Sequence, residues 1–129
     1  MTQNMLFRKG TLALINVRSF ADVLYDEDKC RFLVIKNVTG RGSESKFNLI
    51  GTRTHIHPLQ EQFLTPMFEI EEADLNINDI QKIVEKYCVE IIQFLAEKQG
   101  KEIDVSGITD KENYKKIIEL LVKELDKKA

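Results

Sequence analysis

The chain has 129 residues, of which 43% are hydrophobic and 31% are charged, and its formal net charge is −2. These values are typical of one globular domain with its own core, and they exclude a disordered, collagen-like or low-complexity chain. The small negative charge excludes a polycation that coats nucleic acid with its whole surface.

No stretch approaches the ~18 uninterrupted apolar residues of a membrane span, and the first residues lack the apolar segment of a signal peptide. Cys30 and Cys88 form no Cys-x-x-Cys pair, so neither a zinc ribbon nor thioredoxin-type chemistry is indicated. We therefore expect a cytoplasmic protein with reduced thiols, no cofactor and no membrane association.

Residues 11–25 are rich in β-branched and aromatic side chains, and apolar or small residues occupy their odd positions, which favours a strand. The polar residues 26–29 predict a turn and residues 30–38 a second apolar strand, so we favour a long hairpin. The alternative is a short helix over residues 19–26, since Ser19 and Asp22 resemble a capping box.

The next elements are also predicted to be strands. The two glycines in residues 39–43 predict a turn, and residues 46–57 predict a third strand that Pro58 ends. Gly51 within this strand indicates a bulge or a bend. Residues 67–71 alternate apolar side chains with glutamates, which is typical of a half-buried edge strand.

From residue 78 onwards the apolar period changes to 3.6, which predicts two helices. Asn78 is the predicted N-cap of the first helix, and Gly100 is its predicted stop. The second helix is predicted to begin at the Thr-x-x-Glu capping box of residues 109–112. In the linker between the helices, Ile103 and Val105 are able to form an extra edge strand.

These elements predict an α+β fold. We expect an N-terminal curved, mainly antiparallel sheet of four or five strands, followed by two C-terminal amphipathic helices packed on one face. We expect a single domain over residues 1–129, with a strand-rich basic half in residues 1–73 and a helical acidic half in residues 78–127.

Both predicted helices carry more apolar surface than one face of a sheet needs to cover. Val89 and Ile92 widen the apolar stripe of the first helix, and Leu120 and Val122 widen that of the second. We interpret these four residues as an interface with a protein partner or with a second copy of the chain, and we expect a homo-oligomer.

Charge is distributed unevenly, because residues 1–60 sum to +4 and residues 61–129 to −6, and every arginine lies in the first part. The planar guanidinium of arginine suits phosphate and aromatic stacking better than the ammonium of lysine. An alternative function is therefore binding of nucleic acid or a phosphate-bearing ligand on an arginine-lined sheet surface. Its candidate residues are Arg18, Arg31, Arg41, Lys46, Arg53 and Phe47.

His55 and His57 share one face of the predicted third strand, so a metal-dependent enzyme that uses both histidines is a second alternative. Their spacing nominates no third ligand. The sequence contains neither a Gly-x-Ser-x-Gly elbow nor a His-Glu-x-x-His motif. We therefore expect no catalytic residue, no resident metal and no enzymatic activity.

The sequence favours a small non-catalytic binding protein that docks a protein partner. Two observations motivate this hypothesis: catalytic motifs are absent, and the helices have apolar surface in excess. An adaptor, an inhibitor or immunity-type protein, and a phage-assembly component all fit this description.

Overall fold

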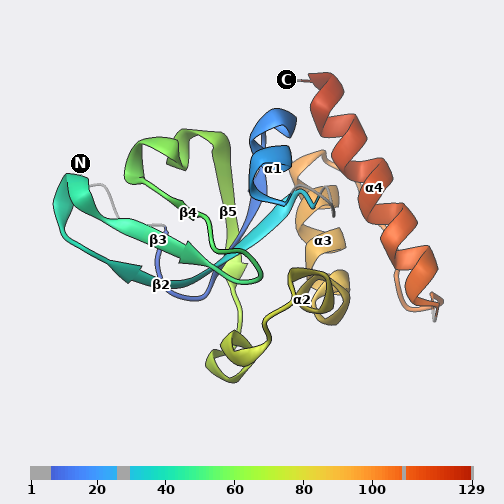
Figure 1. Cartoon of the computed structure of the whole chain (residues 1–129). Coiled ribbons are helices and arrows are strands. Elements are labelled where there is room, and N and C mark those ends of the chain that lie inside the picture. The colour runs from blue at the N-terminus through green and yellow to red at the C-terminus, as the bar shows by residue number, and fades with distance from the viewer. Residues whose placement is uncertain (1–6, 26–29, 109, 129) are drawn as a thin grey trace. The chain divides into compact units, whose positions relative to one another are not determined.

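The computed structural model describes residues 7–25, 30–108 and 110–128, and the chain forms two compact units, Met1–Gln81 and Lys82–Ala129 (Figure 1). The first unit holds the sheet, and the second unit holds the last two helices. The predicted class, α+β with an N-terminal curved antiparallel sheet followed by helices, is confirmed.

Five strands form one open, curved sheet in the first unit. The strands are β1 (Thr11–Ile15), β2 (Phe32–Thr39), β3 (Lys46–Leu49), β4 (His55–Ile56) and β5 (Leu64–Glu69). All neighbours are antiparallel, and the order across the sheet is β4-β3-β2-β1-β5. All five residues of β1 are buried, so β1 contributes side chains from both of its faces to the core.

Strand β2 pairs with two neighbours, with β1 through its first half and with β3 through its second half. The register with β3 shifts between Ile35 and Asn37, which places a β-bulge at Lys36. The bulge changes which side chains point to the core, because Ile35 is fully buried whereas Asn37 is exposed.

Residues 18–24 form a helix, α1 (Arg18–Leu24), so the long hairpin of residues 11–25 and 30–38 is wrong and the alternative of a short helix over residues 19–26 is confirmed. No side chain caps the start of α1 at Val17, so the predicted capping box is not what begins it. Burial favours the helix, because Ala21 and Leu24 lie three residues apart and are both buried. The turn predicted at residues 26–29 lies outside the described residues.

The third predicted strand, residues 46–57, is in fact a pair of strands. β3 and β4 are antiparallel, with Phe47 opposite Ile56, and the residues between them reverse the chain. Gly51 has a φ of 82° in this reversal, and a Cβ there would lie 3.3 Å from the backbone nitrogen of Ile80. The bend predicted at Gly51 is therefore a complete turn.

Strand β5 lies at the edge of the sheet next to β1, as the alternation of residues 67–71 predicted, and it begins earlier, at Leu64. Its central residues are half-buried. Pro66 lies opposite Ala13 in this strand, and an edge strand tolerates a residue without a backbone N–H. A 3-10 helix, η2 (Pro58–Phe63), leads from β4 into β5. Two more 3-10 helices are η1 (Gly42–Glu44) and η3 (Glu72–Asn76).

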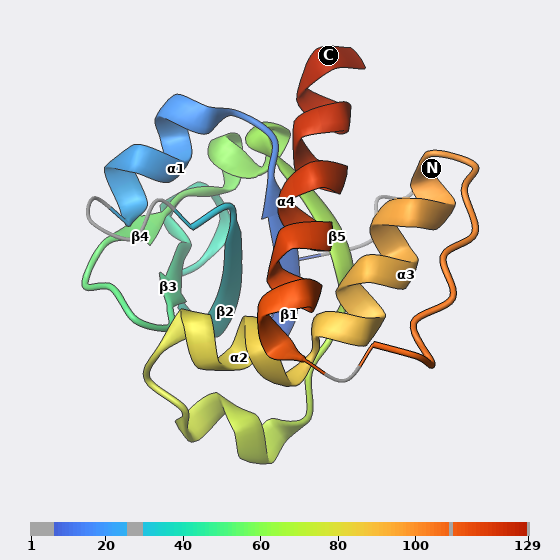
Figure 2. The same ribbon diagram turned by 90° about the vertical axis from the view of Figure 1, so that its right-hand side faces the viewer.

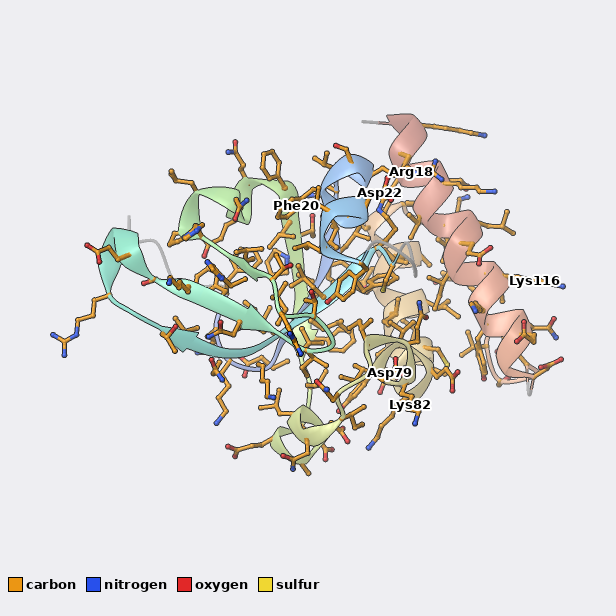
Figure 3. The ribbon with its side chains drawn as sticks, viewed as in Figure 1. Arg18, Phe20, Asp22, Asp79, Lys82 and Lys116 are labelled. Atoms are coloured by element: carbon orange, nitrogen blue, oxygen red, sulfur yellow. The ribbon has the colours of Figure 1, made fainter. Side chains whose placement is uncertain are left out.

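The first predicted C-terminal helix is two helices, α2 (Ile80–Lys86) and α3 (Cys88–Lys98), which meet at Tyr87. Asp79 rather than Asn78 caps α2, because its Oδ1 accepts the backbone N–H of Gln81 at 3.0 Å (Figure 3). The apolar stripe continues through the break with Tyr87 and Cys88 both buried, so the sequence pattern contains no sign of it.

In the second unit, α3 and α4 (Lys111–Lys128) pack side by side (Figure 2). Helix α3 ends at Lys98, and Gly100, its predicted stop, follows with a φ of 70°. The N–H groups of Gly100 and Lys101 donate to the carbonyls of Glu97 and Ala96 at 3.0 and 2.8 Å, which is the Schellman arrangement. No helix in the described part of the chain is long and apolar enough to cross a membrane.

In the linker before α4, one prediction is wrong and another lies partly outside the described residues. Ile103 and Val105 lie in irregular structure, so the extra edge strand is wrong. Asp110 caps α4 through the backbone N–H of Glu112 at 3.0 Å, while Thr109 lies outside the described residues.

Candidate functional site

The six residues predicted for an arginine-lined surface do not form one surface. Arg31 donates from Nε and Nη2 to the carbonyl oxygen of Ile15 at 3.0 and 2.8 Å, so its guanidinium ties the start of β2 to the end of β1. Phe47 is 2% exposed and belongs to the core. Neither side chain is presented to a ligand.

The other four are exposed but lie at separate places in the first unit. Arg18 begins α1, while Arg41 and Lys46 flank the turn between β2 and β3. Arg53 lies in the turn at the opposite end of β3. Only Arg41 and Lys46 are therefore neighbours.

Helices α1 and η2 adjoin through the ring pair of Phe20 and Phe63, and both carry further exposed apolar side chains. We call the apolar residues on these two elements the α1–η2 surface. Its members are apolar, and they belong to α1, to the residue before α1 and to η2. The surface consists of Val17, Phe20, Val23, Leu59 and Phe63. Val23 is 69% exposed and Leu59 is 83% exposed, which makes them the most exposed large hydrophobic residues in the described part of the chain.

An aromatic pair joins the two halves of this surface. The rings of Phe20 and Phe63 are 5.3 Å apart between centroids and tilted by 53°, and both side chains are half-buried. Figure 3 shows Phe20 on the side of α1 that faces β5, whereas Arg18 and Asp22 extend from its other side. Phe20 and Val23 lie on one flank of α1 because they are three residues apart.

Hydrogen bonds hold η2 against the end of β1. The backbone N–H of Asn16 donates to the carbonyl of Phe63 at 2.7 Å, and the hydroxyl of Thr65 donates to Asn16 Oδ1 at 3.0 Å. Because these bonds fix the chain at Phe63 and just after it, Phe63 lies on a backbone that is already positioned before any partner arrives.

The polar groups around η2 cap the helix and contribute one carboxyl group. The backbone N–H of His57 donates to Gln60 Oε1 at 2.8 Å, and the backbone N–H of Gln60 donates to the carbonyl of His57 at 2.9 Å. Partial burial raises the pKa of Glu61 above its usual value. The surface is thus mainly apolar, with Glu61 at its edge.

The two histidines lie together beside this helix. The His55 and His57 rings are 4.9 Å apart between centroids and nearly perpendicular. In residues 7–25, 30–108 and 110–128, no group of three or more His, Cys, Asp and Glu side chains is placed to hold a metal ion. The structure therefore adds no third ligand to this pair.

The four helix residues predicted as an interface differ in exposure. Ile92 and Val122 are 0% and 6% exposed, so a single chain already covers them. Val89 is half-buried, and Leu120 remains 62% exposed. The excess of apolar surface on α3 and α4 is thus much smaller than the sequence indicates, and Leu120 is its main exposed member.

Sequence reasoning missed the α1–η2 surface, because aliphatic and phenylalanine residues are ordinary core residues in any sequence. One signal was present: Leu59 is the single apolar residue between Pro58 and Phe63, which is an unusual position in a polar stretch. No known family, curated protein or solved structure matches this chain.

Proposed function

We propose that this chain is a small non-catalytic module that binds a protein partner through the α1–η2 surface. The observation that carries the proposal is the exposure of Val23 and Leu59 at 69% and 83% beside the half-buried pair of Phe20 and Phe63. Large exposed apolar side chains cost solubility, and together they are typical of interaction sites.

The composition of the surface suits a protein more than a small ligand. Interface energy is concentrated in a few aromatic and large apolar anchors that become fully desolvated when the partner covers them. Phe20 and Phe63 have the properties of such anchors, and Val23 and Leu59 provide the surrounding apolar contact. The partner in this proposal presents a complementary apolar surface of its own.

Quantitative affinity purification from the source organism tests the proposal. Leu59→Glu places a charge within the proposed apolar contact, and we expect it to reduce capture of the partner about tenfold or more. Gln93→Glu is the control, because it introduces the same charge at an exposed residue on α3 in the second unit.

The proposal requires a polypeptide that the wild type and Gln93→Glu retain equally and that Leu59→Glu loses. If every retained polypeptide binds all three baits equally, the α1–η2 surface is not a docking site. Circular dichroism of each variant verifies that the fold is intact, as expected for residues with these exposures.

A further inference from the structure

The outer face of strands β2, β3 and β4 carries a set of polar side chains that the sequence did not reveal. Asn37 pairs with Asn48, and Asn48 pairs with His55, so the three lie in one row across the strands. Thr39 pairs with Lys46 in the next row of the same face. We call these five residues the polar sheet face.

The polar sheet face points away from the core. The alternate residues of β3 and β4, Phe47 and Ile56, are 2% and 0% exposed. The bulge at Lys36 turns Asn37 and Thr39 to the same side as Asn48. Asn37, Thr39 and Lys46 are exposed, while Asn48 and His55 are half-buried.

The two asparagines form a preorganised donor and acceptor pair. Asn48 Nδ2 donates to Asn37 Oδ1 at 2.7 Å and to Thr39 Oγ1 at 3.3 Å. In the part of the chain that the structure describes, this leaves Asn37 Nδ2 and Asn48 Oδ1 without a partner. Asn37 thus keeps a donor and Asn48 an acceptor for a ligand, and amide groups of this kind contact the edges of nucleobases.

The segment that contains this face has a positive net charge, although the whole chain carries −2. From residue 36 to residue 57 the sequence contains four basic residues and one carboxylate, a sum of +3. The basic residues are Lys36, Arg41, Lys46 and Arg53, and the carboxylate is Glu44. Lys46 lies on the polar sheet face itself, so an anionic ligand meets an ammonium next to the two amides.

From this arrangement we infer that the polar sheet face binds single-stranded nucleic acid. Lys46 contacts a phosphate, the amides of Asn37 and Asn48 contact base edges, and the ring of His55 offers a surface on which a base stacks. Three strands at their usual spacing make a strip about 10 Å wide, which suits one strand with its bases turned to the sheet. This inference is independent of the proposed protein-binding function, because it uses none of the residues of the α1–η2 surface.

Fluorescence anisotropy with a labelled single-stranded oligonucleotide of about 10 nucleotides tests the inference, with RNA and DNA as separate probes. Lys46→Glu is expected to weaken binding by at least tenfold. It should also make the plot of the logarithm of the binding constant against the logarithm of the salt concentration less steep by about 0.7. The matched control is Lys116→Glu, an equal charge change at an exposed lysine on α4 (Figure 3), which is expected to leave binding within about twofold.

Asn37→Ala and Asn48→Ala separate base contacts from simple attraction between charges. We expect each to weaken binding about fivefold to tenfold at every salt concentration without changing the slope. Asn37 is exposed, so its replacement does not threaten the fold.

Three results would overturn the inference. The first is that neither probe binds at micromolar concentration, and the second is that Lys46→Glu and Lys116→Glu weaken binding equally. The third is that heparin binds as tightly as the oligonucleotides and the asparagine variants bind like wild type, since the chain would then attract any polyanion. Binding of RNA only, or of DNA only, supports the inference and shows which of the two nucleic acids the face prefers.

Discussion

Arg31 contributes to the stability of the fold rather than to a binding surface. Two of its nitrogens donate to the carbonyl of Ile15, and the backbone N–H of Ile15 donates to the carbonyl of Arg31 at 2.7 Å. We expect Arg31→Ala to lower the free energy of unfolding by about 1.5–3 kcal/mol, because hydrogen bonds from a charged group are lost. Urea denaturation measures this change. Arg53→Ala, at an exposed turn, is the control and should stay within about 0.5 kcal/mol of wild type.

Tyr25 makes stability depend on pH in the alkaline range. Its side chain is 5% exposed, its hydroxyl donates to the carbonyl of Ile50 at 3.2 Å, and burial raises its pKa well above the usual 10.0. The unfolded chain therefore releases this proton near pH 10 while the folded chain keeps it. Below the unfolded pKa, ionisation of Tyr25 does not alter stability. Above it, the unfolded state binds fewer protons, and stability falls as the pH rises.

We expect this group to remove about 1.4 kcal/mol of unfolding free energy per pH unit above about pH 10. Tyr25→Phe lacks the ionisable hydroxyl, so its free energy of unfolding should fall less steeply over the same range. Urea denaturation of both proteins at several alkaline pH values measures the difference. Parallel curves for the two proteins would show that Tyr25 ionises equally in both states.

Substitution of Ile91 tests the assignment of the face of α3 that points to the core. Ile91 is 0% exposed, so Ile91→Asp places an unpaired charge where no water reaches it. We expect a loss of at least about 4 kcal/mol, which is most of the unfolding free energy of a chain near the lower end of the ordinary range of about 5–15 kcal/mol. Gln93→Asp, two residues further along the same helix and exposed, is the control and should remain folded. A soluble Ile91→Asp variant with a wild-type circular dichroism spectrum would contradict this assignment.

The helices were easier to predict than the sheet. Apolar residues three and four positions apart predict α3 and α4 directly, and Gly100 marks a true helix end, because these signals are local. The bulge at Lys36 and the reversal at Gly51 depend instead on contacts between strands that are distant in sequence. The apolar residues at odd positions continue into α1 and led to the prediction of a strand there. The burial of Ala21 and Leu24, three residues apart, favours a helix instead.

The candidate sites were less predictable for the same reason. Val23 and Leu59 are 36 positions apart in the sequence, and only the contact between Phe20 and Phe63 shows that α1 and η2 adjoin. Asn37 and Asn48 likewise share a face only because the bulge shifts the register of β2. A single sequence contains neither piece of information.

At the scale of the whole molecule, a homo-oligomer stays a prediction that now depends mainly on Leu120. If copies associate through α4, Leu120→Glu should convert the oligomer to a monomer, because a carboxylate would be buried in the contact. Sedimentation velocity of wild type and variant measures the mass of each. A wild-type protein that sediments as a monomer over the whole micromolar range contradicts the prediction.

In the proposed function, a protein partner covers α1 and η2. Hydrogen–deuterium exchange of the wild-type chain, alone and with the captured partner, shows which segments the partner covers. We expect slower exchange on binding in peptides that contain residues 17–24 and 58–63, and unchanged exchange in peptides from α4. Slower exchange confined to α4, with α1 and η2 unchanged, would contradict it.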